Sequence, residues 1–577
     1  MSDRASSRTP SPVSALLAQF NKPRSRVPGV LGSVTYLVGF VDIASGLARG
    51  WRLRLNPLIE LLPGAIAAAS AATVVSGILL LLLAHGLKRR KHRAWLAALL
   101  LVSISVALHA FKLELVPLAM SSAVLIALIL YRGEFRALGD PTTRWLALRV
   151  LLLLTASSLA VGVLGVTLLR SHVVGGPPGV GEIVSEVLTG LVGLGGPLTF
   201  RDERSSEFEG AVLLGLGLMT ALTSIYLALR PPEPRPQLTD ADDAAMRQML
   251  KDSSDSLGYF NLRRDKSVVW SDSRKAAIAY RVVSGVMLAS GDPLGDPEAW
   301  PGAIANFLTE AERHAWTPAV IGCSERAGTV WCRLTGFSAL ELGDEAVVEV
   351  AGFSLDGRPM RNVRQMVKRI ERAGYTTEVL RAGSVSEGER RRALADASAW
   401  RGTETERGFS MALGRLVDPV DPDCAFVVAR QDGVMRAFLQ FVPWGSEAMS
   451  LDVMRRDRSA DAGVNELLIV EALRSSATLG VSRVSLNFAA FRSTIERGER
   501  LGAGPFLRAW RTVVLFASAR FQIESLYRFN AKFQPTWVPR FVVFPGARDL
   551  PRITLAVLEA EAFLTWPRLR RLGGGGW

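Results

Sequence analysis

Long apolar runs fill the first 230 positions of the chain and do not recur after them. Six runs have the roughly 17–25 residues that a helix needs to cross a bilayer. They lie at about residues 30–47, 65–87, 94–110, 115–131, 145–169 and 210–229. Beyond Pro236, charged residues recur throughout. The pattern predicts a membrane domain of about six helices at residues 27–230, followed by a cytoplasmic region.

Basic residues between the apolar runs predict how the helices are oriented. Lysine and arginine gather before the first run and after the second, fourth and sixth runs, for example at residues 88–93. Cytoplasmic loops of membrane proteins carry an excess of these residues. We therefore expect a multi-pass protein of the cell membrane with both termini in the cytoplasm and a basic tail at residues 1–26. Arg49, Arg52 and Arg54 count against this orientation but are the minority.

Two charged residues, Asp42 and Arg149, fall inside the predicted spans. An ionisable residue at membrane depth can mark the path of a polar substrate. Each of the two also lies within reach of a predicted interface, where its side chain can find water or a local partner. The pattern leaves both interpretations open.

Helix and strand patterns alternate after residue 230, which predicts an α/β fold. Predicted strands lie at residues 267–271, 277–280, 286–289 and 346–351, and predicted helices at 301–314 and 361–373. The pattern then restarts with a helix at 386–401, a hairpin at 425–430 and 436–442, a strand at 448–453, a helix at 463–479 and a strand at 484–488. We predict two successive units, residues 231–385 and 386–577, rather than one large sheet.

The formal net charge of +14 favours a polyanionic partner, either a membrane surface or a nucleic acid. Basic cytoplasmic loops explain part of this charge. The best candidate patch is one predicted helix with cationic residues at helical spacing: Arg361, Arg364, Lys368, Arg369 and Arg372. No aromatic residue is interleaved with them, so a contact would be with phosphates. A solvated helix face is the competing interpretation.

Several common chemistries find no support in the sequence. The three cysteines form no CxxC pair, which fits a reducing compartment. Only His314 of the five histidines follows residue 230, so a two-histidine metal site or a Ser-His-Asp triad is not expected there. No P-loop or credible dinucleotide motif occurs, and residues 458–463 lack the glycine-rich loop expected for coenzyme A. We predict no metal and no cofactor.

Four stretches carry a resemblance to a known family. They are SLDVMR at residues 450–455, GVNELL at 463–468, VSLNF at 484–488 and YRFNAKFQPTWVPR at 527–540. They resemble the synthase domain of the aminoacyl-phosphatidylglycerol synthases, the multiple-peptide-resistance-factor family. The likeness extends in particular to the membrane and transferase half of the mycobacterial two-function lysyl-phosphatidylglycerol proteins. It covers most of residues 240–570.

The resemblance implies a tandem of two acyltransferase folds of the GNAT type, the second of which is catalytic. That unit would take an aminoacyl group from charged tRNA and pass it to the glycerol hydroxyl of phosphatidylglycerol. The sequence departs from the family in two ways. It ends at Trp577 without the fused lysyl-tRNA synthetase of the mycobacterial proteins, and its six predicted spans leave out the separate flippase module of the largest members.

The resemblance also assigns the candidate catalytic residues. Asp452 would face the ammonium group of the donor beside Arg455, and a surface ion pair is the alternative. Glu466, near a predicted helix start, is either a helix-end stabiliser or part of the pocket wall. Asn487 is a polar residue in an apolar strand, where its amide must find partners.

Candidate substrate-binding residues lie in the proline-punctuated segment near the C-terminus. Lys532 and Arg540 suit a phosphate, either of the lipid or of tRNA. Trp537 either contributes to the same site or anchors the core. Sequence does not separate tRNA contact from membrane contact for the basic helix at residues 361–373.

We therefore predict a tRNA-dependent phosphatidylglycerol aminoacyltransferase, with lysyl as the first choice for the transferred group. Its product would carry less negative charge than phosphatidylglycerol and so repel cationic antimicrobial peptides. Alanyl transfer is the second reading, and a lipid transporter or scaffold without catalysis is the third. Whether the chain forms a homo-oligomer is left open.

Overall fold

The computed structural model describes residues 27–47, 63–88, 90–135, 141–191, 193, 196–201, 203–229, 234, 236–401, 408–490 and 523–564. Residues 23–232 belong to one compact unit, the helical unit, and residues 233–311 and 316–577 to another, the α/β unit. The basic tail at residues 1–26, Arg49, Arg52 and Arg54, and the side chain of Arg149 lie outside what the structure describes.

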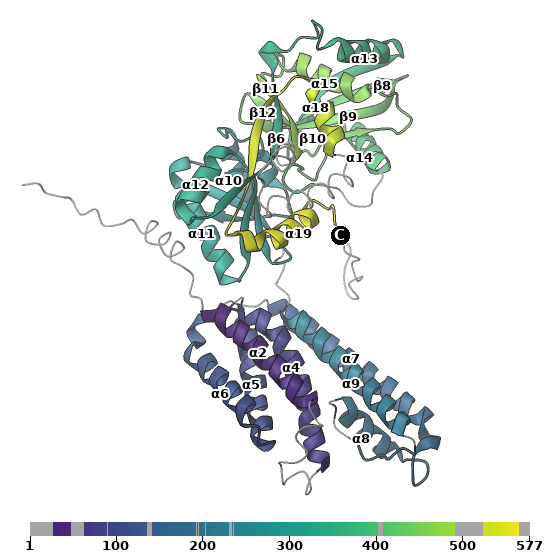
Figure 1. Cartoon of the computed structure of the whole chain (residues 1–577). Helices are drawn as coiled ribbons and strands as arrows, with labels where there is room; N and C mark the ends of the chain where they lie inside the picture. Colours follow the sequence, from purple (N-terminus) through teal and green to yellow (C-terminus); the bar gives the residue numbers. More distant parts are fainter. Residues whose placement is uncertain are drawn as a thin grey trace, which may run out of the picture. The chain divides into compact units, whose positions relative to one another are not determined.

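Six long helices make up most of the described part of the helical unit (Figure 1). They are α2 (Val27–Leu47), α4 (Pro63–Lys88), α5 (His92–Phe111), α6 (Leu115–Leu130), α7 (Pro141–Leu168) and α9 (Glu203–Leu229), and a shorter helix, α8 (Val180–Leu191), precedes α9. Each long helix overlaps one predicted span. Within the described residues, three stretches are long and apolar enough to cross a membrane: Val27–Ser45, Ala94–Phe111 and Val150–Leu168. The unit is membrane-associated, and the number of crossings stays a prediction.

Apolar side chains cover much of the surface of these helices. Leu115 and Leu130 of α6 are 77% and 72% exposed, and Leu153 of α7 is 67% exposed. Such surface is costly in water and suits lipid. Between α2 and α4, two glycines allow close backbone approach, because a Cβ on Gly77 would lie only 2.6 Å from the carbonyl oxygen of Gly39.

The α/β unit contains one mixed sheet of twelve strands within the described residues. The strands are β1 (Ser267–Trp270), β2 (Ala276–Val283), β3 (Val286–Ser290), β4 (Leu294–Gly295), β5 (Thr317–Cys323), β6 (Ser338–Glu349), β7 (Tyr375–Arg381), β8 (Ala425–Gln431), β9 (Val434–Trp444), β10 (Ala448–Arg456), β11 (Arg483–Ala490) and β12 (Thr536–Phe544). Their order is β1-β2-β3-β5-β12-β6-β11-β10-β9-β8-β7, with β4 beside β2.

The strands of the two predicted units join in this one sheet. Strand β12, from the end of the chain, lies between β5 and β6, and β6 in turn pairs with β11. Strands from both sides of residue 385 therefore alternate in the centre of the sheet. The α/β class itself, and the hairpin of β8 and β9, agree with the prediction.

The same local arrangement occurs twice in the sheet. Strands β2 and β3 form a hairpin, helix α11 (Trp300–Arg313) follows, and β5 returns parallel to β3. Strands β9 and β10 likewise form an antiparallel pair, helix α15 (Val464–Ser475) follows, and β11 returns parallel to β10. These are the two parallel pairs among the described strands, and all the other pairs are antiparallel.

Helices cover both faces of the sheet, so its strands are buried on both sides. Alternate residues of β8 point into different cores: Val427 packs under α13 (Arg361–Arg372) and α15, while Phe426 and Val428 face α14 (Glu387–Arg401). The remaining described helices are α10 (Asp240–Leu250), α12 (Glu325–Thr335), α18 (Ile523–Ala531) and α19 (Leu550–Ala560).

Candidate functional site

The parallel strands β10 and β11 separate shortly after they pair. Their register covers only Ala448 to Ser450 on β10, opposite Arg483 to Ser485 on β11. Beyond this point β10 has an irregularity between Leu451 and Val453, and β11 has one between Ser485 and Phe488. Both strands therefore leave regular pairing at the same level. We call this opening the splay.

Asn487 bridges the splay. Its backbone has a φ of 69°, in the left-handed region, and its side-chain amide donates a hydrogen bond of 2.7 Å to the carbonyl oxygen of Leu451 on β10. The amide thus replaces a backbone ladder bond that the diverging strands cannot make. The sequence predicted that the amide of Asn487 needs a partner within an apolar strand, and the carbonyl oxygen of Leu451 is such a partner.

Asn530 of α18 lies beside it. This residue is 1% exposed, and its amide donates a 3.2 Å hydrogen bond to the carbonyl oxygen of Leu486. The side-chain oxygens of Asn487 and Asn530 are buried, and neither accepts a hydrogen bond from the described residues. Buried amide oxygens normally have partners. Sequence reasoning missed Asn530, although a lone amide in an aromatic helix was a usable signal.

Glu466 and Lys532 form an ion pair although 66 residues separate them. The Lys532 ammonium nitrogen lies 2.7 Å from a carboxylate oxygen of Glu466, and the side chains are 41% and 9% exposed. Glu466 is in the first turn of α15, where the helix dipole favours a negative charge. Gly463, the N-cap of that helix, has a φ of 111°, and a Cβ there would lie only 2.4 Å from the side chain of Met366.

Trp537 packs on Tyr527 at the beginning of β12. The ring centroids are 5.0 Å apart with an interplanar angle of 33°. Trp537 is half-buried against the core beneath α15 and α18. This contact supports the anchor interpretation of Trp537.

Asp452 supports a neighbouring segment of chain. Its two carboxylate oxygens accept hydrogen bonds from the backbone N–H of Leu413, at 2.8 Å, and from the side-chain amide of Gln440, at 2.6 Å. Gln440 in turn accepts a 2.7 Å hydrogen bond from the backbone N–H of Val417. Asp452 and Gln440 together therefore hold residues 413–417 against the sheet.

The bulge at Asp452 brings it to the same face as Arg455. In a regular strand residues three apart point to opposite faces. Here Asp452 contacts Gln440, and Arg455 lies opposite Phe438, two residues from Gln440 on β9. Both side chains therefore share the face that carries Phe438.

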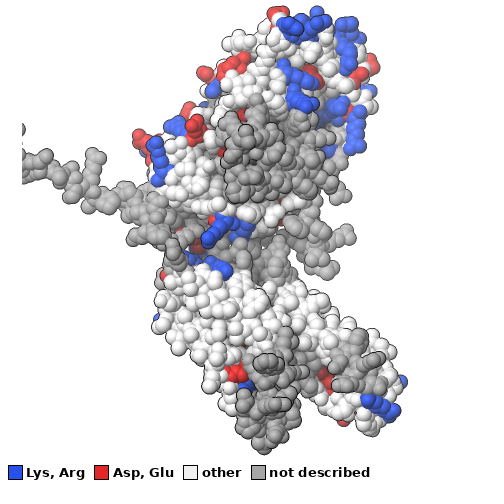
Figure 2. Space-filling model, viewed as in Figure 1, with Lys and Arg blue, Asp and Glu red and all other residues white. Residues whose placement is uncertain are grey.

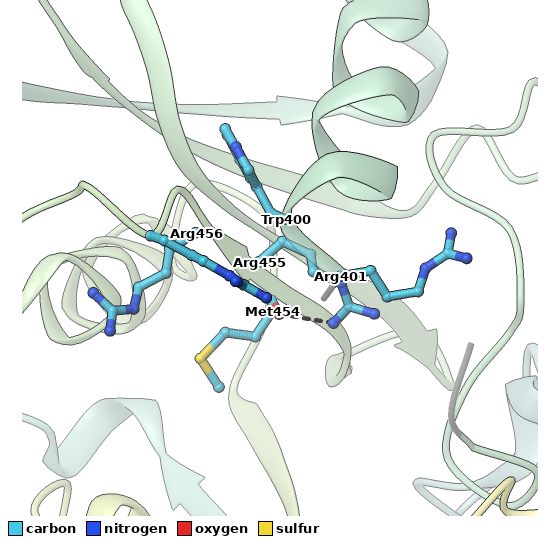
Figure 3. A pocket seen from close by; sticks show the side chains of 6 residues that line it. Trp400, Arg401, Met454, Arg455 and Arg456 are labelled. Atoms are coloured by element: carbon cyan, nitrogen blue, oxygen red, sulfur yellow. Dashed lines mark hydrogen bonds between the residues drawn. The ribbon is translucent and has the colours of Figure 1, made fainter. Parts of the chain in front are cut away.

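Arg455 lines a shallow surface hollow of about 350 Å³ (Figure 3). Its guanidinium donates a 3.0 Å hydrogen bond to the carbonyl oxygen of Met454. The hollow is lined by Trp400, Arg401, Met454, Arg455, Arg456 and Arg458. Four of the six lining residues are arginines, the residue type that binds phosphate groups most readily. We call it the arginine hollow.

Arg540 lies inside the core. The residue is 4% exposed, and its guanidinium donates to Glu345 at 2.6 and 2.8 Å and to Asp255 at 2.7 Å. These carboxylates and the Ser256 hydroxyl, at 2.5 Å, occupy its donors. Burial, together with the carboxylate of Asp255, raises the pKa of the nearby Asp292 to about 7. Arg540 is a structural cation here, so we leave it out of the proposed site.

The basic helix α13 forms as predicted, but its cations differ in their contacts. Arg364 donates to the backbone carbonyl oxygens of Leu355 and Gly357, and Arg369 to that of Ala462. Arg361, Lys368 and Arg372 are exposed. In Figure 2, Lys and Arg side chains gather over the part of the α/β unit where Figure 1 shows α13.

The chain is similar in sequence to known proteins over the strands and helices of the candidate site. A family model described as phosphatidylglycerol lysyltransferase, C-terminal, matches residues 247–544. A lysylphosphatidylglycerol biosynthesis bifunctional protein of Rhodococcus opacus is 43% identical over 508 residues, which is 85% of this chain and 45% of that protein. A protein of the same description from Nocardia farcinica is 50% identical over 363 residues, 62% of this chain and 32% of its own length. The chain thus matches less than half the length of these relatives.

Among solved structures, the L-PGS structure from Bacillus licheniformis has a similar fold. The TM-score is 0.51 at 21% sequence identity, over 58% of this chain and 100% of that one. This likeness shows that the α/β unit shares its fold with that protein.

Proposed function

Because the chain belongs to the phosphatidylglycerol lysyltransferase family, we propose that it moves a lysyl group from charged tRNA to the glycerol hydroxyl of phosphatidylglycerol. The observation that carries this proposal is the family match over residues 247–544, which includes β10, α15, β11 and β12. The product would lower the negative charge of the membrane and so weaken the binding of cationic peptides.

The α/β unit is proposed to contain two GNAT-like folds, at residues 231–385 and 386–577. The repeated arrangement of hairpin, helix and parallel strand supports this division, even though the strands join in one sheet. The second copy would be catalytic because it contains the splay between β10 and β11. No cofactor is part of the proposal.

The reaction exchanges one ester for a similar ester, so it needs alignment more than an energy source. It requires a tRNA ester and a lipid hydroxyl held together, removal of the hydroxyl proton and stabilisation of an oxyanion. We place the aminoacyl group at the splay. There the oxygens of Asn487 and Asn530 would accept hydrogen bonds from its ammonium groups.

The ion pair of Glu466 and Lys532 belongs to the same proposed site. Lys532 has three N–H donors and is partly exposed, so it can contact a lipid phosphate while Glu466 fixes its position. Asp452 enters as a positioning residue, since its carboxylate holds residues 413–417 against β9 and β10. Trp537, packed on Tyr527, would anchor the beginning of β12 beside the site.

The proposed tRNA contacts are the arginine hollow, including Arg455, and the exposed cations of α13. Arg361, Lys368 and Arg372 remain in this proposal. Arg364 and Arg369 support backbone carbonyl groups, so their part would be to hold the helix in place. Contacts of this kind bind the phosphates of tRNA and do not distinguish its bases.

Mass spectrometry of cellular lipids tests the function. A host that makes phosphatidylglycerol but no aminoacylated lipid should contain lysyl-phosphatidylglycerol only when it expresses the chain. Alanyl-phosphatidylglycerol in its place would establish the alanyl reading. The absence of any aminoacylated lipid, with the protein present in the membrane, would contradict transferase activity.

We also propose that the chain crosses the membrane several times and that both of its termini are cytoplasmic. The basic residues at positions 88–93 support this orientation. Topology reporters fused at Lys91 and Arg235 should report the cytoplasm, and one near Gly195 the outside. An outside signal at Arg235 would separate the α/β unit from tRNA and contradict the proposed function.

A further inference from the structure

A set of ionisable side chains lies inside the helical unit, where α2, α4 and α5 run side by side (Figure 1). Asp42 of α2 and His109 of α5 are both 0% exposed. The Nε2 atom of His109 is 2.9 Å from Asp42 Oδ1, and its Nδ1 atom is 2.8 Å from Glu114 Oε2. Glu114 belongs to the turn between α5 and α6. One imidazole therefore joins two carboxylates.

This geometry fixes the number of protons in the set. A neutral imidazole has one N–H group and one lone pair. With both carboxylates ionised, only an imidazolium ion can donate to Asp42 and Glu114 at the same time. With a neutral imidazole, one of the carboxyl groups must carry the proton instead. In either case the three groups hold one proton more than two carboxylates and a neutral histidine would hold.

The surrounding donors stabilise Glu114 as an ionised carboxylate. Lys112 lies 3.2 Å from Glu114 Oε2 and donates to Ser45 Oγ at 3.2 Å. Ser45 donates to the same Glu114 oxygen at 2.5 Å. With both carboxylates ionised, the imidazole keeps both of its N–H groups, because a ring lone pair facing a carboxylate oxygen at 2.8 or 2.9 Å would be repulsive.

Among the described residues, the neighbouring helices supply hydrogen-bond partners to the set. Ser105 of α5 donates to Asp42 Oδ2 at 2.7 Å, and Ser76 of α4 lies 2.9 Å from Ser105. Helix α6 has no ionisable side chain, and the ionisable residues of α4 are His85 and Lys88. Lys88 lies beside Gly32, ten residues before Asp42 on α2.

We propose that Asp42, His109 and Glu114 form a proton-binding site in the helical unit. The bound proton joins α2 to the turn between α5 and α6, because both hydrogen bonds of His109 depend on it. The proton comes from water and returns to water. Glu114, with 10% of its side chain exposed, is the member through which it enters. This site is separate from the proposed transferase site and does not depend on it.

Nitrogen NMR of the full-length chain in lipid nanodiscs, labelled at histidine, tests the proposal. At pH 8, above the range in which an ordinary histidine is charged, one histidine should show protons on both ring nitrogens. That signal should vanish in His109→Gln and persist in His172→Gln, a matched control at an exposed histidine. Infrared spectra report the case in which the proton lies on a carboxyl group instead of on the imidazole. A protonated carboxyl band lost in Asp42→Asn or Glu114→Gln would also support the site.

A singly protonated His109 with no such carboxyl band at pH 8 would overturn the proposal. A second readout follows from linkage. A proton held by the folded state and released by the unfolded state makes the unfolding equilibrium constant rise by about tenfold per pH unit as pH increases. The helical unit should show this slope in the wild type and lose it in Glu114→Gln. An equal slope in both proteins would also overturn the proposal.

Discussion

Replacing Arg540 with glutamine should strongly destabilise the α/β unit. The change leaves the carboxylates of Glu345 and Asp255 buried without their cation. Removing one partner of a buried ion pair costs about 3–5 kcal/mol, a large share of the roughly 5–15 kcal/mol that stabilises a typical domain. Protease resistance of the full-length chain, measured against urea, reports the loss.

Arg548→Gln is the matched control for this variant, since Arg548 is exposed and lies on the same segment of chain. The control should match the wild type. Arg540→Gln should also recover stability as pH falls. Unpaired buried carboxyl groups have raised pKa values in the folded state, so protonation favours that state. Wild-type urea resistance in Arg540→Gln would show that Arg540 does not hold the centre of the sheet.

Replacing Asp452 with asparagine should reduce both product and stability. Both carboxylate oxygens accept N–H donors, so the amide NH₂ of asparagine must face either Leu413 N–H or the Gln440 amide. Leaving the donor of one of these half-buried hydrogen bonds without an acceptor costs about 1–3 kcal/mol. The sequence alone suggests a fold close to wild type, and these contacts change that expectation. Product should fall by about ten- to a hundred-fold.

Two further variants test whether Asp452 positions residues 413–417 or contacts the aminoacyl donor directly. Asp432→Asn, at an exposed turn position with a φ of 53°, should be neutral because asparagine tolerates this conformation. Gln440→Met removes the other half of the support for residues 413–417. If Asp452 is a positioning residue, Gln440→Met and Asp452→Asn should lose product in proportion to lost stability. Full activity in Asp452→Asn would contradict any role for this carboxylate.

Local patterns predicted the local structure of the chain. The hairpin around Gly433 could be predicted because a two-residue Asp-Gly turn between two alternating apolar runs is a strong local signal. Helix α13 ends before Gly374, whose φ of 87° suits a helix stop. Strand β12 was missed as the partner of β5 and β6, because pairing between strands some 200 residues apart leaves no local trace in one sequence.

In the candidate site too, features set by local sequence could be predicted and contacts between distant residues could not. Asn487 could be identified because an amide in an apolar strand needs a partner. The pairing of Glu466 with Lys532 depends on how α15 and α18 pack, which spacing does not encode. The sequence suggested a phosphate contact for Arg540, because its carboxylate partners lie far away along the chain and cannot be identified from spacing.

The most direct test of the account is a transfer assay with membranes that contain the full-length chain and phosphatidylglycerol. Lysyl-tRNA charged with labelled lysine should yield labelled lipid without added ATP or coenzyme A, and RNase should abolish the product. Labelled lipid formed from free lysine and ATP after RNase treatment, or no labelled lipid from intact lysyl-tRNA, would contradict the account.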